Sequence, residues 1–445
     1  MSAPGAPLIS FVAYRVKRRM AAFTLGRRRL AVLLGAAALI VSVAVLWGPA
    51  LIAQYDRYRG RVAMQRFQTD AGVKWLLAGE SIAPDDAETH FLLARAFRRQ
   101  GKYDDAARHL KRAAQYGMSA ARIKLEYRLS IAQTARVRDV QAHLPGMLMS
   151  AGEDGEDICA AYVNGLCLSL DFVAANKLVD VWTADYPDSA EPYFGRGNVC
   201  FGQSDWQGAV SAYQKCLQLD PARTQARLLL AHCLLNMNDP ALAEPQFRQV
   251  LRELPDNSAA RLGLGMCLTN LTRIDEARTV FHDIVKRAPR DCDARQRLGE
   301  LELQARRPEA ALEWIRPIAE AWPDDPAIAM MMSQGLQQTG HAAEAREYWE
   351  VVRRGEQATA RLDKLTNDVR HRPADLALRC EIGTLFLRYR SREDGVNWLN
   401  SVLQYEPRHK GAHRALAEYY SKIGDDRSAE EHRRAADEAG SVPGP

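Results

Sequence analysis

The residues that could do chemistry are histidines and cysteines, and neither set has the spacing of a known site. His409 and His413 lie four residues apart, which would bring two imidazoles to one metal ion if both were helical. His409 closely follows Pro407, however, and is expected in a turn. No carboxylate-bearing motif accompanies the pair, so the sequence predicts no metal site.

The eight cysteines include no pair separated by two residues, which excludes the usual zinc spacing and covalent haem attachment. Gly195 and Gly197 resemble half of a dinucleotide-binding motif, as do Gly263 and Gly265, but both pairs lie in expected helices. There is no phosphate-binding loop, nucleophile elbow or zinc-protease motif. We therefore predict no enzyme, no cofactor and no small-molecule substrate.

The elements that carry these residues repeat every 34 residues along the middle of the chain. Four columns recur at this spacing: Pro187, Pro221, Pro255, Pro289 and Pro323; Ala175, Ala209, Ala243, Ala277, Ala311 and Ala345; Val179, Tyr213, Phe247, Phe281, Ile315 and Trp349; and Gly197, Ala231, Gly265, Gly299 and Ser333. A large residue four positions after each alanine lies on the same side of a helix, and a proline ends each unit. Each unit is therefore a helical hairpin that must stack on neighbours to bury its apolar face.

These columns resemble the tetratricopeptide repeat family, whose 34-residue units are helix–turn–helix hairpins. Residues 190–223 match best, with Tyr193, Gly197, Tyr213 and Pro221 in place. The resemblance implies an all-α fold, a right-handed α-solenoid of about ten hairpins. The uncharged segment at residues 30–53 is expected to place one transmembrane helix before it.

One column departs from the family's pattern. Where the family has a bulky aromatic residue early in the first helix, this chain has Arg227, Arg261, Arg295 and Arg379. We expect this difference to change surface chemistry more than the fold.

Seven segments are predicted along the chain. They are a basic tail (1–29), an apolar helix (30–53), connector helices that cap the first repeat (54–86), the main solenoid (87–355), an extra helix (356–375), C-terminal repeats (376–438) and a disordered tail (439–445). Repeats of the main solenoid are predicted to start near residues 87, 121, 156, 190, 224, 258, 292 and 326. The extra helix, where the period is lost, is either a hinge or a tolerated insertion, and we favour the insertion.

The formal net charge of +5 arises in the tail, because residues 1–29 hold seven basic and no acidic side chains. The rest of the chain is nearly neutral, which argues against nucleic-acid binding. Residues 30–53 carry no charge and would span about 36 Å as a helix, enough to cross a bilayer. A retained signal anchor is favoured over a cleaved signal peptide or a buried helix.

The basic residues before this segment outnumber those after it, which predicts a cytoplasmic N-terminus. The protein is thus expected to be a single-pass membrane protein with its repeats outside the cytoplasm, in the periplasm if the source is bacterial.

The first helices of such repeats usually line a groove, and here their polar residues recur at equivalent positions of successive helices. Asn and Gln there could bond to the backbone of an extended peptide, with apolar residues between them supplying contact. The candidate groove residues are Phe194, Asn198, Phe201, Leu228, His232, Asn236, Met266, Asn270, Glu300, Gln304, Gln334 and Gln338. The alternative is an ordinary solvated helix face.

The sequence therefore predicts a membrane-anchored scaffold that binds partner proteins or an extended peptide through the groove. The alternatives are a structural or assembly subunit of a cell-envelope complex, or an enzyme accessory protein.

Overall fold

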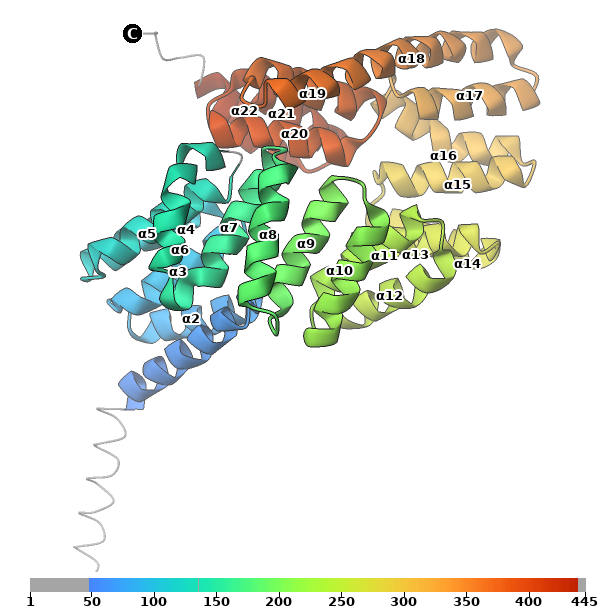
Figure 1. Ribbon diagram of the computed structural model, residues 1–445. Helices are drawn as coiled ribbons and strands as arrows, with labels where there is room; N and C mark the ends of the chain where they lie inside the picture. Colours follow the sequence, from blue (N-terminus) through green and yellow to red (C-terminus); the bar gives the residue numbers. More distant parts are fainter. Residues whose placement is uncertain (1–47, 135, 439–445) are drawn as a thin grey trace, which may run out of the picture. The chain divides into compact units, whose positions relative to one another are not determined.

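The computed structural model describes residues 48–134 and 136–438, and every regular element within these ranges is a helix (Figure 1). The chain divides after Tyr127 into two compact units. They are called the N-terminal unit and the C-terminal unit below, and each is described by itself.

The N-terminal unit consists of a helix over residues 48–65 followed by α2 (Thr69–Ile82), α3 (Ala87–Arg99), α4 (Tyr103–Gln115) and the beginning of α5 (Ala120–Ala132). Its core gathers Met64, Leu76, Phe91 and Leu110, one from each of the four helices up to α4. The α5 helix joins them through the buried carboxylate of Glu126, which accepts hydrogen bonds from Arg95 and Arg98 of α3.

The C-terminal unit is a series of helical hairpins. Its long helices are α7 (Gly155–Leu168), α8 (Phe172–Asp185), α9 (Ala190–Gly202), α10 (Trp206–Leu219), α11 (Thr224–Asn236), α12 (Pro240–Glu253), α13 (Ser258–Asn270), α14 (Ile274–Arg287), α15 (Cys292–Gln304), α16 (Pro308–Ala321), α17 (Pro326–Gln338), α18 (Ala342–His371), α19 (Leu376–Tyr389), α20 (Arg392–Tyr405), α21 (Lys410–Ile423) and α22 (Asp426–Glu438). Before them, η1 (Val137–Asp139), η2 (Gln141–His143), α6 (Leu144–Met149) and η3 (Gly152–Asp154) stand where a long second helix would otherwise follow α5. From α9 to α17 the hairpins follow one another in chain order (Figure 1).

Several hairpins are closed by a large side chain that lies against a glycine on a neighbouring helix, as Tyr213 does at Gly197 and Ile315 at Gly299. A Cβ atom added to Gly265 of α13 would lie 2.4 Å from the Phe281 ring of α14, within the same hairpin. A Cβ atom on Gly263 would lie 2.4 Å from Phe247 of α12, in the preceding hairpin. Both rings are fully buried. The small-residue column predicted from the sequence therefore sets how closely successive helices approach.

The turn within each hairpin uses a left-handed residue. Positive φ angles of 56–62° recur every 34 residues at Leu170, Ser204, Asn238, Thr272 and Arg306, and Gly340 continues the series at 85°. Only the last of these is a glycine, the residue that adopts this conformation without steric cost. The turn geometry is thus imposed by helix packing rather than by local sequence preference.

The arginine column that departs from the family closes the turns between hairpins. At seven prolines that lie between hairpins, the residue six positions later donates a hydrogen bond to the proline's carbonyl oxygen, which we call the proline clasp. Pro323 has no clasp, because the residue six positions after it is Ala329. Arg227 Nη2 lies 2.6 Å from the oxygen of Pro221, and Arg295 Nε lies 2.7 Å from that of Pro289. The other clasps pair Tyr193 with Pro187, Arg261 with Pro255, Arg379 with Pro373, His90 with Pro84 and His413 with Pro407. The clasp satisfies a carbonyl that the end of a helix leaves without a backbone partner.

The α18 helix differs from the other second helices because it continues without interruption for 30 residues. Residues 357–371 are its second half. The large residue of its repeat column, Trp349, is 43% exposed, whereas Tyr213, Phe247 and Phe281 are fully buried.

After α18 the last hairpins return to contact the repeats that precede it. Arg392 at the start of α20 forms ion pairs with Asp325 at 2.5 Å and with Asp293 at 3.4 Å. Its guanidinium carbon lies 4.7 Å from the ring centroid of Trp322, and Tyr419 of α21 packs on the same indole at 6.1 Å. These contacts join α20 and α21 to the first turn of α15 and to the turn before α17.

The predicted membrane location requires a correction. Within residues 48–134 and 136–438, no helix is both long enough and apolar enough to span a bilayer. A single-pass membrane protein is therefore not supported by the structure. Residues 48–53, which are the last of the predicted span, belong to a helix that continues to residue 65 and carries charged side chains such as Asp56 and Arg57.

Several other predictions fall on residues that the structure does not cover. The basic tail (1–29), residues 30–47 of the predicted span and the C-terminal tail (439–445) lie outside the described residues.

The contact between Gly265 and Phe281 predicts that a single added methyl group at Gly265 destabilises the protein. We expect Gly265→Ala to lower the free energy of unfolding by about 1–3 kcal/mol, because the added carbon overpacks a buried contact. Gly146 of α6 is the matched control, since a Cβ atom there would meet nothing within 4 Å. Gly146→Ala should leave stability unchanged or raise it by up to about 1 kcal/mol. Urea unfolding measures both, and equal midpoints for the two variants would contradict the packing account.

Candidate functional site

The twelve predicted groove residues all lie on the first helices of five consecutive hairpins, α9, α11, α13, α15 and α17. Eleven of them occupy the fifth, ninth or thirteenth position of their helix, and Phe201 occupies the twelfth. Positions four apart share one side of a helix, and none of the twelve is fully buried. We call this set the inner face. That it binds a ligand stays a prediction.

The part of the inner face on α9, α11 and α13 is mainly apolar. Phe194, Phe201, Leu228 and Met266 are partly buried and pack against the main hydrophobic core. Leu262 and Leu235 extend the same surface between them. The result is a row of side chains that are anchored on one side and open to contact on the other.

His232 belongs to this apolar part. Its ring meets the buried Phe247 edge-on, with ring centroids 5.1 Å apart. Burial lowers the pKa of His232 below its ordinary value of 6.5, since the charged imidazolium would lose its solvation there. The imidazole is therefore neutral at pH 7 and adds to the apolar character of the surface.

The amides of the inner face lie at the ends of the helices. Asn236, Asn270, Gln304 and Gln338 are the last residues of α11, α13, α15 and α17, and all four are exposed. Gln334 is also exposed, one turn earlier on α17. Within the described residues none of these amides has a hydrogen-bond partner, so each offers both a donor and an acceptor to a ligand.

Two predicted groove residues are engaged within the protein. Asn198 Oδ1 accepts a hydrogen bond from the hydroxyl of Tyr213 at 2.9 Å. Glu300 accepts from Gln296 at 3.1 Å and from Arg297 at 2.8 Å. These two side chains therefore have hydrogen-bonding partners within the protein. The repeat pattern alone does not distinguish them from the unpartnered amides.

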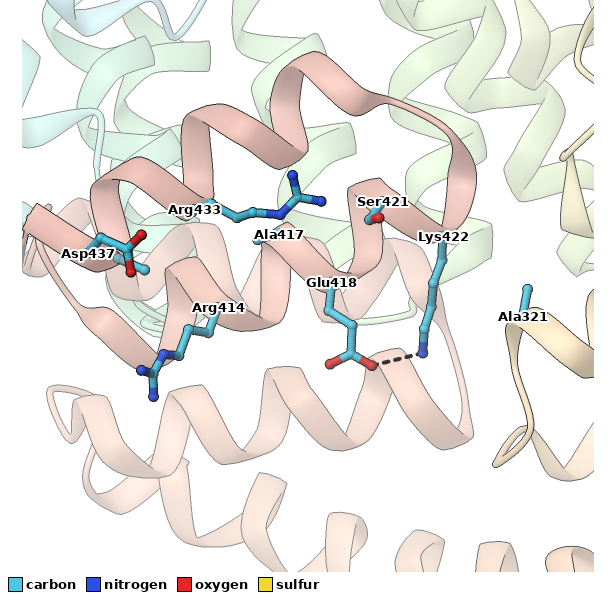
Figure 2. Close-up of a pocket in the computed structure, with 9 residues that line it drawn as sticks. Ala321, Arg414, Ala417, Glu418, Ser421, Lys422, Arg433 and Asp437 are labelled. Carbon is cyan, nitrogen blue, oxygen red and sulfur yellow. Dashed lines mark ion pairs between the residues drawn. The ribbon is translucent and has the colours of Figure 1, made fainter.

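A pocket that the sequence did not indicate lies where α21 and α22 face the end of α16 (Figure 2). It has a volume of about 680 Å³ and is lined by Ala321, Arg414, Ala417, Glu418, Ser421, Lys422, Arg433, Ala436 and Asp437. Lys422 and Glu418 form an ion pair at 2.9 Å across one side of it. The lining mixes both signs of charge, and its residues come from segments about 100 positions apart in sequence, which explains why no local motif marks it.

The histidine and cysteine side chains were also placed by the structure. His409 caps α21 by accepting from the backbone N–H of Ala412 at 3.1 Å, while the ring of His413 faces His432, so the imidazoles of His409 and His413 have different partners. All eight cysteines are free thiols. Burial raises the pKa of Cys216 and of Cys267 to about 12, which keeps both protonated and unreactive. A different group, formed by Glu80, His90 and His109, has the side chains to hold a metal ion.

Comparison with known families identifies the repeats. One tetratricopeptide repeat family matches residues 201–245, 237–298 and 273–335, and a second matches residues 89–117. The chain therefore contains tetratricopeptide repeats, as the sequence pattern predicted. No curated protein sequence matches the chain significantly.

Solved structures of repeat proteins resemble the chain at a distance. YrrB, described as a tetratricopeptide repeat protein with an unusual peptide-binding site, is 23% identical, covers 43% of this chain and 96% of its own, and has a TM-score of 0.37. The MamA protein is 19% identical, with coverages of 39% and 94% and a TM-score of 0.34. Yeast Tom70 is 16% identical, with coverages of 89% and 85% and a TM-score of 0.35. At these values the superpositions say nothing about function.

The buried position of His232 predicts a pH effect. Its folded-state pKa is depressed, so as the pH falls from 7 the unfolded chain takes up a proton first, and the free energy of unfolding decreases. We expect the melting temperature to fall between pH 7 and pH 5, and to fall less in His232→Gln. Thermal unfolding followed by circular dichroism measures the difference. Parallel pH profiles for the two proteins would show that His232 titrates normally.

Proposed function

We propose that this chain, a carrier of tetratricopeptide repeats, is a non-enzymatic scaffold that binds an extended segment of a partner protein across its inner face. One observation carries the proposal: a row of half-buried apolar side chains on α9, α11 and α13 adjoins exposed, unpartnered amides at the ends of α11, α13, α15 and α17.

The two parts of the inner face suit the two kinds of group in an extended peptide. A peptide backbone presents N–H and C=O groups along its length, and an amide side chain can pair with both. Apolar side chains of the ligand would bury further surface against Phe194, Leu228 and Met266, each already fixed by the core behind it. Such prior fixation lowers the entropic cost of binding.

The repeat spacing supports an elongated ligand. Asn236, Asn270, Gln304 and Gln338 recur once per hairpin at the same helix position, so the same polar contact is offered several times along the array. A compact small molecule would use one such position. An extended peptide uses several in succession, and its affinity then rises with the number of hairpins engaged.

The amides provide the sharpest test of this proposal. Peptides selected from a random displayed library against the full chain should contain spaced apolar residues and bind Asn236→Ala/Asn270→Ala more weakly. Loss of two hydrogen bonds at about 0.5–1.5 kcal/mol each corresponds to a decrease of roughly 5- to 150-fold. Fluorescence anisotropy with labelled peptides measures the dissociation constants.

The matched control replaces two amides on the second helix of a hairpin. Gln214 and Gln218 of α10 are exposed, and Gln214→Ala/Gln218→Ala should bind the selected peptides as the parent chain does. Equal affinity for the parent chain, the inner-face variant and a Leu228→Asp variant would place binding elsewhere. Cross-linking in cells then separates an adaptor, which yields varied partners, from an assembly subunit, which yields fixed ones.

A further inference from the structure

Three side chains with metal-binding atoms converge in the N-terminal unit, each from a different helix. They are Glu80 of α2, His90 of α3 and His109 of α4. The two histidine Nδ1 atoms lie 3.1 Å apart, and Glu80 Oε1 lies 3.5 Å from that of His90 and 3.8 Å from that of His109. Around a tetrahedral zinc ion with bonds of about 2.0–2.2 Å, ligand atoms are roughly 3.3 Å apart. The three donors already have nearly that separation.

The surroundings of His90 fix which of its nitrogens is available. His90 is fully buried, and its Nε2 lies 2.8 Å from the carbonyl oxygen of Pro84. A carbonyl only accepts, so Nε2 carries the hydrogen and Nδ1 carries the lone pair directed at the other two side chains. Histidines that bind metals are held in the same way, with the second nitrogen donating to a carbonyl or carboxylate.

Space for a further ligand lies beside His109. A pocket of about 310 Å³ is lined by His109, Arg108, Lys111, Arg112 and Gln115. Arg112 Nη1 is 3.1 Å from Glu80 Oε1 and therefore competes with a metal for that oxygen. Its side chain is 57% exposed, so the guanidinium can leave for solvent when a metal arrives.

We propose that Glu80, His90 and His109 bind a divalent transition-metal ion, zinc being the best fit to two imidazoles and one carboxylate, with a water in the fourth position facing this pocket. The bound ion joins α2, α3 and α4 and stabilises the N-terminal unit, since a ligand that binds only the folded state adds to its stability.

The C-terminal unit contains a natural comparison for this site. His413 and His432 have Nδ1 atoms 2.8 Å apart, and His413 Nε2 lies 2.9 Å from the carbonyl oxygen of Pro407. This pair repeats the arrangement of His90 and His109, including an aromatic ring stacked on the second histidine, which is Phe97 on His109 and Tyr420 on His432. It has no third ligand, because among the described residues only the cluster with Glu80 brings three such groups together. The carboxylate is thus what distinguishes a site from a pair of hydrogen-bonded rings.

Titration of the purified full chain with Co²⁺ and Zn²⁺ tests the proposal. We expect one equivalent of Co²⁺ to give the intense visible absorption of tetrahedral cobalt, and Zn²⁺ to displace it. Glu80→Gln should weaken binding at least tenfold. Arg112→Gln should strengthen it several-fold, because the competing guanidinium is gone, and a purely structural role for the cluster would not produce that gain. His432→Asn should leave the affinity unchanged.

Three outcomes would overturn the site. They are the absence of saturable binding at micromolar metal, equal affinity in the parent chain and Glu80→Gln, and loss of binding in His432→Asn. Circular dichroism of each variant confirms that it is folded. Arg112 is exposed, and Glu80→Gln keeps the size of a mostly buried side chain.

Discussion

The hairpins of the C-terminal unit are held in register because large side chains lie where neighbouring helices have only backbone. Phe281 fills the space over Gly265 in its own hairpin, and Phe247 fills the space over Gly263 in the next one. Each buried ring contributes about 1.5–3 kcal/mol of apolar burial, and each does so only while the glycine opposite stays bare. Close helix approach follows from this contact where a glycine is present, and the left-handed turns at Thr272 and its equivalents recur with the same 34-residue spacing.

Much of this arrangement could be read from the sequence because it is local and periodic. The columns at Gly265 and Phe281 specify which helix faces meet, and their 34-residue spacing specifies the hairpin. The proline clasp was not foreseen, although the arginines that form it were noticed as a departure. A lone column of arginines does not reveal that its partner is a carbonyl six residues earlier. The continuity of α18 was missed for a related reason: the period stops at residue 353, but helical structure does not.

The two candidate sites also differ in how far the sequence predicts them. The residues of the inner face lie on the first helices of their hairpins, since helix position follows directly from the repeat, but that they bind a ligand stays a prediction. What the pattern could not show is which of its polar residues are already engaged, as Asn198 is with Tyr213. The cluster of Glu80, His90 and His109 was invisible because its members are ten and nineteen residues apart and meet only through the packing of three helices. A site whose residues come from different helices leaves no recognisable motif in the sequence.

The long α18 helix has a mechanical consequence. At 1.5 Å per residue its 30 residues form a rod of about 45 Å, and helices resist bending unless a proline or glycine pair interrupts them. The rod is continuous with the hairpins before it, and the hairpins after it are tied back to those same hairpins by Arg392. The final hairpins are thus connected to the preceding ones twice, through α18 and through the ion pairs of Arg392. A force applied to α21 or α22 is therefore transmitted to α15 and α17. The final hairpins can turn freely only after Arg392 has released its two aspartates and Tyr419 has left the indole of Trp322.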